Sequence, residues 1–225
     1  MKKLLCLFLA CVLIFTTNQY TYAQESYTIG ELKTLIETCK QNKNIANEMA
    51  ECARKLGYAE DCEIIRTAQI RWKQEDAAQK EYQSLLTEKK SEYPYASQVW
   101  DILESKGYNE YVTAGILGNM MRETGGDTLA LNPFTYSGNY YGLCQWNLTY
   151  NPGVNGLDIP GQLDFLEGNI RTNMDSFGGK GTYDRFCTLQ DEREAARYFN
   201  SCYERGGSTV TRQDNATKAL RHFTN

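Results

Sequence analysis

The stretch Ala114–Trp146, AGILGNMMRETGGDTLALNPFTYSGNYYGLCQW, decides what fold the chain can adopt. Its apolar residues Ile116 and Met120 continue a four-residue spacing that begins at Val112, which is typical of the buried face of a helix. The pair Gly125-Gly126 permits the left-handed backbone that ends many helices. The stretch therefore predicts a buried helix that ends near residue 124 and is followed by a loop.

Glu123 falls in the last turn of this expected helix. The negative end of the helix dipole and the unpaired terminal carbonyls disfavour a charged carboxylate there. Desolvation adds to this effect if Tyr140, Tyr141 and Trp146 exclude water from the carboxyl. A carboxylic acid that keeps its proton near neutral pH can protonate the oxygen of a leaving sugar. Glu123 is therefore a candidate general acid; the alternative is a solvated glutamate at a helix end.

The loop after Glu123 is rich in Gly, Asn, Thr and Tyr, and it ends in the sequence Tyr141-Gly142-Leu143-Cys144-Gln145-Trp146. Aromatic rings stack on sugar rings, and side-chain amides hydrogen bond to hydroxyl and N-acetyl groups. The composition predicts a carbohydrate cleft. The alternative for one or two of these aromatic side chains is a place in the core.

Three segments of the stretch resemble the phage tail lysozyme family, in which a GILGNM helix leads to Glu-Ser and then to Gly-Leu-Gly-Gln-Trp. The segments are Gly115-Ile116-Leu117-Gly118-Asn119-Met120, Glu123-Thr124-Gly125 and Gly142-Leu143-Cys144-Gln145-Trp146. Their order is also similar to that of soluble lytic transglycosylases and goose-type lysozymes. The chain departs from the pattern at Thr124, where the family has Ser, and at Cys144, where it has Gly or Met. Neither change removes a group that the reaction requires.

The resemblance, which runs from about Tyr95 to about Leu220, implies a mainly α, lysozyme-like fold. It further implies an enzyme that cleaves the MurNAc–GlcNAc β-1,4 bond of peptidoglycan, with Glu123 in the position of the catalytic acid. We expect the side chains that bind the sugars to be Asn119, Tyr141, Gln145 and Trp146.

A second carboxylate would decide between two outcomes of this reaction. An inverting hydrolase needs one roughly 6.5–9.5 Å from the acid to activate water, and a retaining hydrolase needs one about 5 Å away. The candidates are Asp127, Asp158 and Asp164, of which Asp127 is nearest to Glu123 along the chain. Lytic transglycosylases use a single glutamate, because the C6 hydroxyl of the substrate closes an anhydro ring. Both outcomes stay open at this point.

Residues 1–23 have the pattern of a secretory signal, with Lys2-Lys3, an apolar run from Leu4 to Phe15, and Ala23 at the cleavage site. We therefore expect an exported protein, periplasmic or secreted, with association with a virion as an alternative. Removal of the two lysines lowers the formal net charge from −4 to −6. An acidic exported chain is a poor nucleic-acid binder, so we expect no nucleic-acid partner.

Six cysteines remain after cleavage, and in an exported protein they predict disulfides whose pairing the sequence leaves open. They are Cys39, Cys52, Cys62, Cys144, Cys187 and Cys202.

Residues 24–92 form a separate region without proline, predicted to be a small helical hairpin followed by a helical arm from about Glu60 to Lys90. The sequence of this region suggests no catalytic or ligand-binding residues, and we expect it to bind a protein partner. The sequence Tyr93-Pro94-Tyr95 breaks the helical pattern and predicts the start of the lysozyme-like domain, residues 93–225. Within that domain we predict a loop over residues 173–182. We expect Glu204 to have a structural role, because a carboxylate among arginines usually stabilises the fold.

Three other classes of protein are weaker alternatives. A zinc amidase or endopeptidase would need two or three histidines, whereas the chain contains only His222, so we expect no metal and no cofactor. A cysteine peptidase would have to pair Cys144 with His222, which is expected at the surface near the chain end. A peptidoglycan-binding module without turnover would not need Glu123. The presence of Glu123 favours the enzyme.

Overall fold

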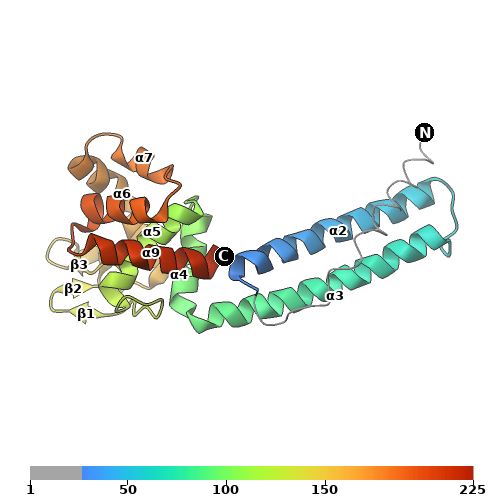
Figure 1. The fold of residues 1–225 in the computed structure, drawn as a ribbon, viewed down its shortest axis with the longest axis horizontal. Helices are drawn as coiled ribbons and strands as arrows, with labels where there is room; N and C mark the ends of the chain where they lie inside the picture. The colour runs from blue at the N-terminus through green and yellow to red at the C-terminus, as the bar shows by residue number, and fades with distance from the viewer. Residues whose placement is uncertain (1–26, 225) are drawn as a thin grey trace. The chain divides into compact units, whose positions relative to one another are not determined.

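The structure is a computed structural model that describes residues 27–224; the predicted signal segment lies outside the described residues. The protein is mainly α, as predicted, with 72% of the described residues in helices (Figure 1). It divides into two compact units, the first ending at Glu88 and the second beginning at Lys89. Within residues 27–224, no helix is both long and apolar enough to cross a membrane.

The first unit consists of two long helices, α2 (Ile29–Lys55) and α3 (Glu63–Glu92), of which the last turn of α3 belongs to the second unit. Thr28 and Glu31 form a capping box at the start of α2. The predicted short hairpin is wrong, because α2 continues through residues 40–44, where no Gly or Pro interrupts it, whereas the predicted helical arm corresponds to α3. Small apolar clusters join the two helices; their buried members are Leu32, Ile36, Cys39 and Tyr82, and Met49, Ala50 and Ala68.

The second unit is built around α5 (Glu110–Thr124), in which every residue from 112 to 121 is buried. The glycines of its Gly-Ile-Leu-Gly sequence let neighbouring helices approach closely. A Cβ on Gly115 would lie 2.6 Å from the Cβ of Ala195 on α8 (Glu192–Phe199). A Cβ on Gly118 would lie 2.5 Å from the backbone nitrogen of Ala216 on α9 (Thr209–Thr224). Side chains at these two positions would force α8 and α9 away from α5.

The remaining elements surround this three-helix centre. They are α4 (Pro94–Ser105), α6 (Ile159–Gly178), α7 (Thr182–Cys187), the 3₁₀ turn η1 (Pro152–Val154) and the π-helical turn η2 (Asn200–Glu204). The ring of Trp100 on α4 stacks on Phe223 of α9 with centroids 4.5 Å apart. Both rings are buried, so this contact fixes α4 to the end of α9.

The loop after Glu123 contains a small antiparallel sheet of three two-residue strands that the sequence analysis did not predict. The strands are β1 (Tyr136–Ser137), β2 (Tyr140–Tyr141) and β3 (Trp146–Asn147), in the order β1-β2-β3. Tyr141 is paired with Tyr136 on one side and with Trp146 on the other. The sheet thus gathers the aromatic residues of the loop.

The predicted loop over residues 173–182 is wrong for its first six residues, because α6 continues to Gly178. Polar residues concealed this part of the helix. The Asn173 amide donates to the carbonyl of Asn169 one turn earlier, and Met174 on the opposite side is fully buried.

All six cysteines of the described chain are free thiols, in contrast to the predicted disulfides. Several of them are instead enclosed by their own neighbours. The Cys202 sulfur faces Gly178, where an added Cβ would lie 3.0 Å away, and burial raises the pKa of Cys187.

Candidate active site

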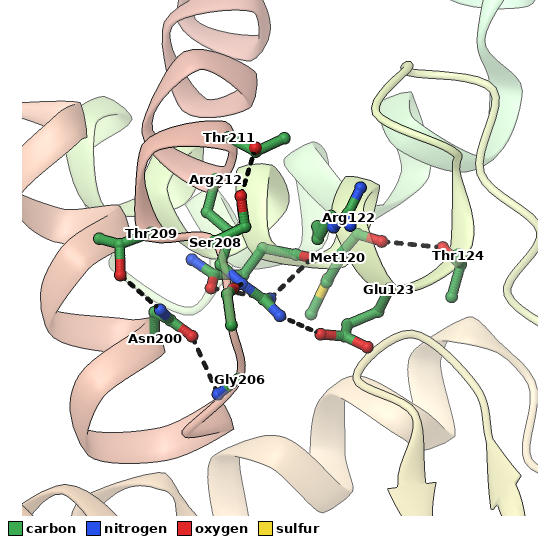
Figure 2. A network of polar contacts seen from close by, with 12 residues as sticks. Met120, Arg122, Glu123, Thr124, Asn200, Gly206, Ser208, Thr209, Thr211 and Arg212 are labelled. Carbon is green, nitrogen blue, oxygen red and sulfur yellow. Dashed lines mark hydrogen bonds and ion pairs between the residues drawn. The ribbon is translucent and has the colours of Figure 1, made fainter.

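The end of α5 places Glu123 at the rim of the second unit. The helix ends at Thr124, whose hydroxyl donates to the carbonyl of Met120 at 2.9 Å, while Gly125 donates its backbone N–H to Met121. Thr124 thus makes the hydrogen bond that a serine would make at this position. The Glu123 side chain is 22% exposed, so solvent or a ligand can reach its carboxyl (Figure 2).

Arg212 on α9 is the charged partner of Glu123. Its Nη2 donates to Glu123 Oε1, and its side chain is only 4% exposed. Its Nη1 donates to Asn119 Oδ1 at 3.1 Å and its Nε to the Gly207 carbonyl at 3.2 Å. The sequence analysis missed Arg212, because no local pattern links it to a glutamate 89 positions earlier. The predicted effects of the helix end on Glu123 did not take this guanidinium into account.

Asn119 lies in the interior with no exposed surface. Its amide donates to the carbonyls of Gly115 and Ala196 at 2.8 and 3.1 Å and accepts from Arg212. This differs from the expected sugar contact, since a fully buried side chain does not reach a ligand. Asn119 instead orients the Arg212 guanidinium.

Asp127 follows Glu123 on the loop, with a left-handed backbone at φ 68°. One carboxylate oxygen pairs with Arg122 Nη1 at 2.7 Å, and the other accepts from Asn215 Nδ2 at 2.9 Å. Partial desolvation raises the pKa of Asp127, but these two hydrogen bonds outweigh it and the pKa lies below its ordinary value. These contacts connect the loop to α5 and α9. The expected role of Asp127 in activating water stays a prediction.

Gln162 on α6 holds the Gly142–Gln145 turn, and the sequence analysis did not identify it. Its side chain is fully buried and accepts from Leu143 N at 2.7 Å, while its amide donates to the carbonyls of Pro133 and Leu157. Gly142 has φ +81°, and a Cβ there would lie 2.4 Å from Gln162 Oε1. Only glycine fits at this position.

Gln145 in this turn adopts a left-handed backbone at φ 46°, which is uncommon for a residue with a side chain. Its amide nitrogen donates to the carbonyls of Thr135 and Gly142, and its buried Oε1 has no hydrogen-bond partner among residues 27–224. Backbone strain together with an unpaired polar atom is characteristic of functional sites.

Tyr141 and Trp146 are mostly buried. The Tyr141 hydroxyl donates to the Leu157 carbonyl at 3.0 Å, and the Trp146 indole donates to the Tyr203 hydroxyl at 2.8 Å. Both polar ends are therefore occupied within the protein. The exposed aromatic surface of the sheet belongs instead to Tyr136 and Tyr140, which are 56% and 45% exposed and which the set of expected site residues did not include.

A second carboxyl, that of Glu204, ends the π-helical turn η2 near Glu123. Glu204 is partly exposed as a residue, but its Oε1 is buried and has no hydrogen-bond partner within the described chain. Burial and the nearby charge of Glu123 raise the pKa of Glu204 to about 8, although the hydrogen bond with Cys144 and the charge of Arg212 lower it. The site thus combines two carboxyls with one buried guanidinium.

The comparison with known families gives one finding. A family model for phage tail lysozyme matches residues 94–223. The chain belongs to the phage tail lysozyme family. No curated protein and no solved structure matches it. Membership in the phage tail lysozyme family suggests a peptidoglycan-cleaving, lysozyme-like function.

One alternative to a phage tail lysozyme loses support from the geometry of the site. A cysteine peptidase needs a reactive thiolate beside a histidine. Burial raises the pKa of Cys144 well above its ordinary value, and its side-chain hydrogen-bond partner is Glu204. His222, expected at the surface, is instead half-buried against the rings of Tyr93 and Phe223. The contacts of Cys144 and His222 therefore provide neither condition.

Proposed function

We propose that the second unit cleaves the MurNAc–GlcNAc β-1,4 bond of peptidoglycan, with Glu123 as the proton donor. One observation carries the proposal: Glu123 ends the buried helix α5 as a partly exposed carboxyl held by a buried arginine. The arginine has a function in this reaction, because it stabilises the carboxylate that forms when Glu123 gives its proton to the glycosidic oxygen.

The small sheet in the loop after Glu123 supplies the exposed aromatic rings that sugar binding needs. Tyr136 and Tyr140 present exposed rings on the small sheet, on which pyranose faces stack. The unpaired Oε1 of Gln145 is buried in this structure, so it accepts from a sugar hydroxyl or an N-acetyl N–H only after the side chain moves. These groups bind sugars through ring faces and hydrogen bonds rather than through charge, in agreement with the uncharged glycan strand of peptidoglycan.

The product chemistry distinguishes hydrolysis from transglycosylation. A hydrolase needs a second carboxylate that activates water, and Asp127 remains the candidate on the same loop as Glu123. The ion pair with Arg122 and the hydrogen bond from Asn215 occupy both Asp127 oxygens. This arrangement favours the second candidate function, a lytic transglycosylase in which Glu123 acts without Asp127. We further propose that the protein acts outside the cytoplasm, in the periplasm or after secretion, where its substrate lies.

Glu123→Gln tests the assignment. The amide keeps the shape of the side chain but cannot donate a proton of suitable acidity, so we expect the rate of peptidoglycan solubilisation to fall at least about 100-fold. Glu110→Gln, an exposed glutamate in the first turn of the same helix, is the matched control and should leave the rate unchanged. A Glu123→Gln rate within about tenfold of the wild type, little more than 1.4 kcal/mol, would exclude Glu123 as the acid.

A further inference from the structure

The groups around Arg212 contain one carboxyl more than its positive charge can balance. Glu123 receives a hydrogen bond from Arg212 and is partly exposed, whereas the buried Oε1 of Glu204 receives none. An ionised carboxylate with one oxygen buried and unpaired, and with only the Cys144 thiol as a side-chain donor, is costly. Burial therefore favours the protonated form of Glu204.

Arg212 lies between the segments that carry the two carboxyls. The Nη2 that donates to Glu123 also faces Gly206, two residues after Glu204, where an added Cβ would lie 2.4 Å from that nitrogen. Figure 2 shows the guanidinium reaching Glu123 with Gly206 close by. Asn119 and the Gly207 carbonyl fix the other nitrogens of Arg212. The positive charge of Arg212 is thus fixed in position. The distribution of protons between Glu123 and Glu204 therefore depends on where this charge lies.

Four titratable or charged groups face Glu204. They are Glu123 on α5, Cys144 after β2, Arg212 on α9, and Tyr203 on η2 itself. From α6, the neutral amide of Asn169 accepts from the Tyr203 hydroxyl at 2.7 Å. Burial raises the pKa of both Cys144 and Tyr203, so neither is charged near neutral pH. The charge balance therefore depends on Glu123, Glu204 and Arg212 alone.

We propose that Glu123 and Glu204 share a single proton beside Arg212, and that Glu204 is the positioning residue that keeps this proton available to Glu123. This inference rests on the proposed function of Glu123. The resting proton in this proposal lies on the buried Glu204, while Arg212 pairs with Glu123. Moving the proton to Glu123 leaves a carboxylate at Glu204 and does not change the net charge of the site.

In each turnover the pair of carboxyls gives up one proton and takes up one proton. Protonated Glu123 gives its proton to the glycosidic oxygen as the bond from that oxygen to C1 breaks, and becomes a carboxylate again. Attacking water, or the C6 hydroxyl of the substrate, forms the new bond to C1 and releases one proton. That proton returns to the pair. Glu204 therefore restores the donor without touching the substrate.

A shared proton has a distinctive dependence on pH. Exchange between the two carboxyls neither takes up nor releases a proton, so the protonated fraction of Glu123 is constant while the pair holds one proton. A carboxylic acid without such a partner loses its protonated fraction about tenfold per pH unit once it has ionised. The pKa of Glu204, about 8, sets the upper limit of the plateau.

The test is the pH profile of kcat/KM for peptidoglycan cleavage from about pH 5 to 9, measured for the wild type and for Glu204→Gln. We expect a wild-type plateau that ends near pH 8 and a Glu204→Gln rate that falls about tenfold per pH unit across the same range. Glu110→Gln is the control and should keep the plateau. Parallel profiles for the wild type and Glu204→Gln would overturn the inference and leave Glu204 a purely structural group.

A second variant covers the case in which Glu204→Gln does not fold. Glu204→Asp keeps a titratable carboxyl, and we expect it to lower the rate while retaining a plateau; a tenfold fall per pH unit in this variant would contradict the inference. Glu123→Gln in the same series separates the two proposals. An active Glu123→Gln refutes the proposed function, whereas an inactive Glu123→Gln beside an unchanged Glu204→Gln profile refutes only the shared proton.

Discussion

Each unit of the protein buries an arginine–glutamate pair beside a cysteine, but the surroundings of the two pairs differ. In the first unit, Arg71 Nη2 and Glu75 Oε1 are 2.7 Å apart on α3 with side chains 8% and 2% exposed. Asn42 on α2 donates to the same Glu75 oxygen at 3.2 Å, and Cys39 hydrogen bonds to Glu75. One positive and one negative charge are thus enclosed together.

In the second unit, the pair of Arg212 and Glu123 has an additional carboxyl, and Glu123 reaches the surface. The first pair is balanced and closed, as expected of a group that fixes how two helices align. The second is unbalanced and open, as expected of a group that exchanges protons with a ligand. In the proposed function, the ion pair that takes part in the chemistry is the one with an additional carboxyl and an accessible surface.

Arg71→Ala tests the structural side of the comparison and should have the largest effect on stability. The variant removes the buried arginine that pairs with the Glu75 carboxylate, so we expect the free energy of unfolding of the first unit to fall by about 3–5 kcal/mol. Chemical denaturation followed by circular dichroism measures this loss. Lys73→Ala, an exposed neighbour on α3, is the control. A loss below about 1 kcal/mol would show that the Arg71 pair does not stabilise the helices.

Glu204→Gln should stabilise the second unit as pH rises. The folded pKa of Glu204, about 8, lies above its ordinary value of 4.5, so between these values the folded state keeps a proton that the unfolded state loses. Stability therefore falls as pH rises from 4.5 towards 8, and glutamine removes this loss. We expect a gain of about 4 kcal/mol at the upper end and none below pH 4.5.

Urea denaturation across that pH range measures the gain, with Glu110→Gln as the control. A stability difference between Glu204→Gln and wild type that does not change with pH would show that Glu204 is not buried as a neutral acid.

Gly206→Ala should disturb the unbalanced pair without altering a charged residue. The new Cβ would lie 2.4 Å from Arg212 Nη2 and displace the guanidinium from Glu123. We expect kcat to fall about tenfold, because the displaced guanidinium no longer stabilises the Glu123 carboxylate in place. A tenfold fall corresponds to about 1.4 kcal/mol of lost transition-state stabilisation. Gly168→Ala on α6 is the control, because a Cβ there has no neighbour within 4 Å. Equal rates for the two alanine variants would contradict a role for the position of Arg212.

Tyr140→Ala should have the smallest effect on activity. Together with Ile70→Ala, it tests whether the exposed apolar side chains of the two units differ in sugar binding. Loss of one stacking ring is worth about 1 kcal/mol, so KM for soluble glycan fragments should rise about fivefold with little change in kcat. Ile70→Ala on α3, 57% exposed, should leave both constants unchanged. An unchanged KM for Tyr140→Ala would show that no sugar ring stacks on Tyr140.

The sequence predicted the centre of the second unit because its signals are local. The spacing of Val112, Ile116 and Met120 defines α5, and Gly125-Gly126 marks its end. Side chains supplied by distant segments could not be predicted: Arg212 lies 89 positions after the glutamate that it contacts, and Gln162 lies 19 positions after Leu143. No short-range pattern encodes such contacts, which arise only when helices pack.

Glu204 shows a different limit of sequence reasoning. Its arginine neighbour in the sequence, Arg205, favoured a structural interpretation, yet Arg205 lies over the ring of Phe177. The charged neighbours of Glu204 in space are Glu123 and Arg212. Whether the charge of a carboxylate is compensated depends on the charged groups near it in space. The residues next to it in the sequence do not reveal these groups.

The central claim, that Glu123 donates the proton that breaks a glycan bond, is tested most directly by the products formed from purified peptidoglycan. Mass spectrometry of the soluble fragments should show new muramic acid ends for the wild type and none for Glu123→Gln. Reducing ends would assign hydrolysis, and anhydro ends would assign transglycosylation; both support the claim. Cut peptides on intact glycan strands, or the same fragments from Glu123→Gln, would contradict it.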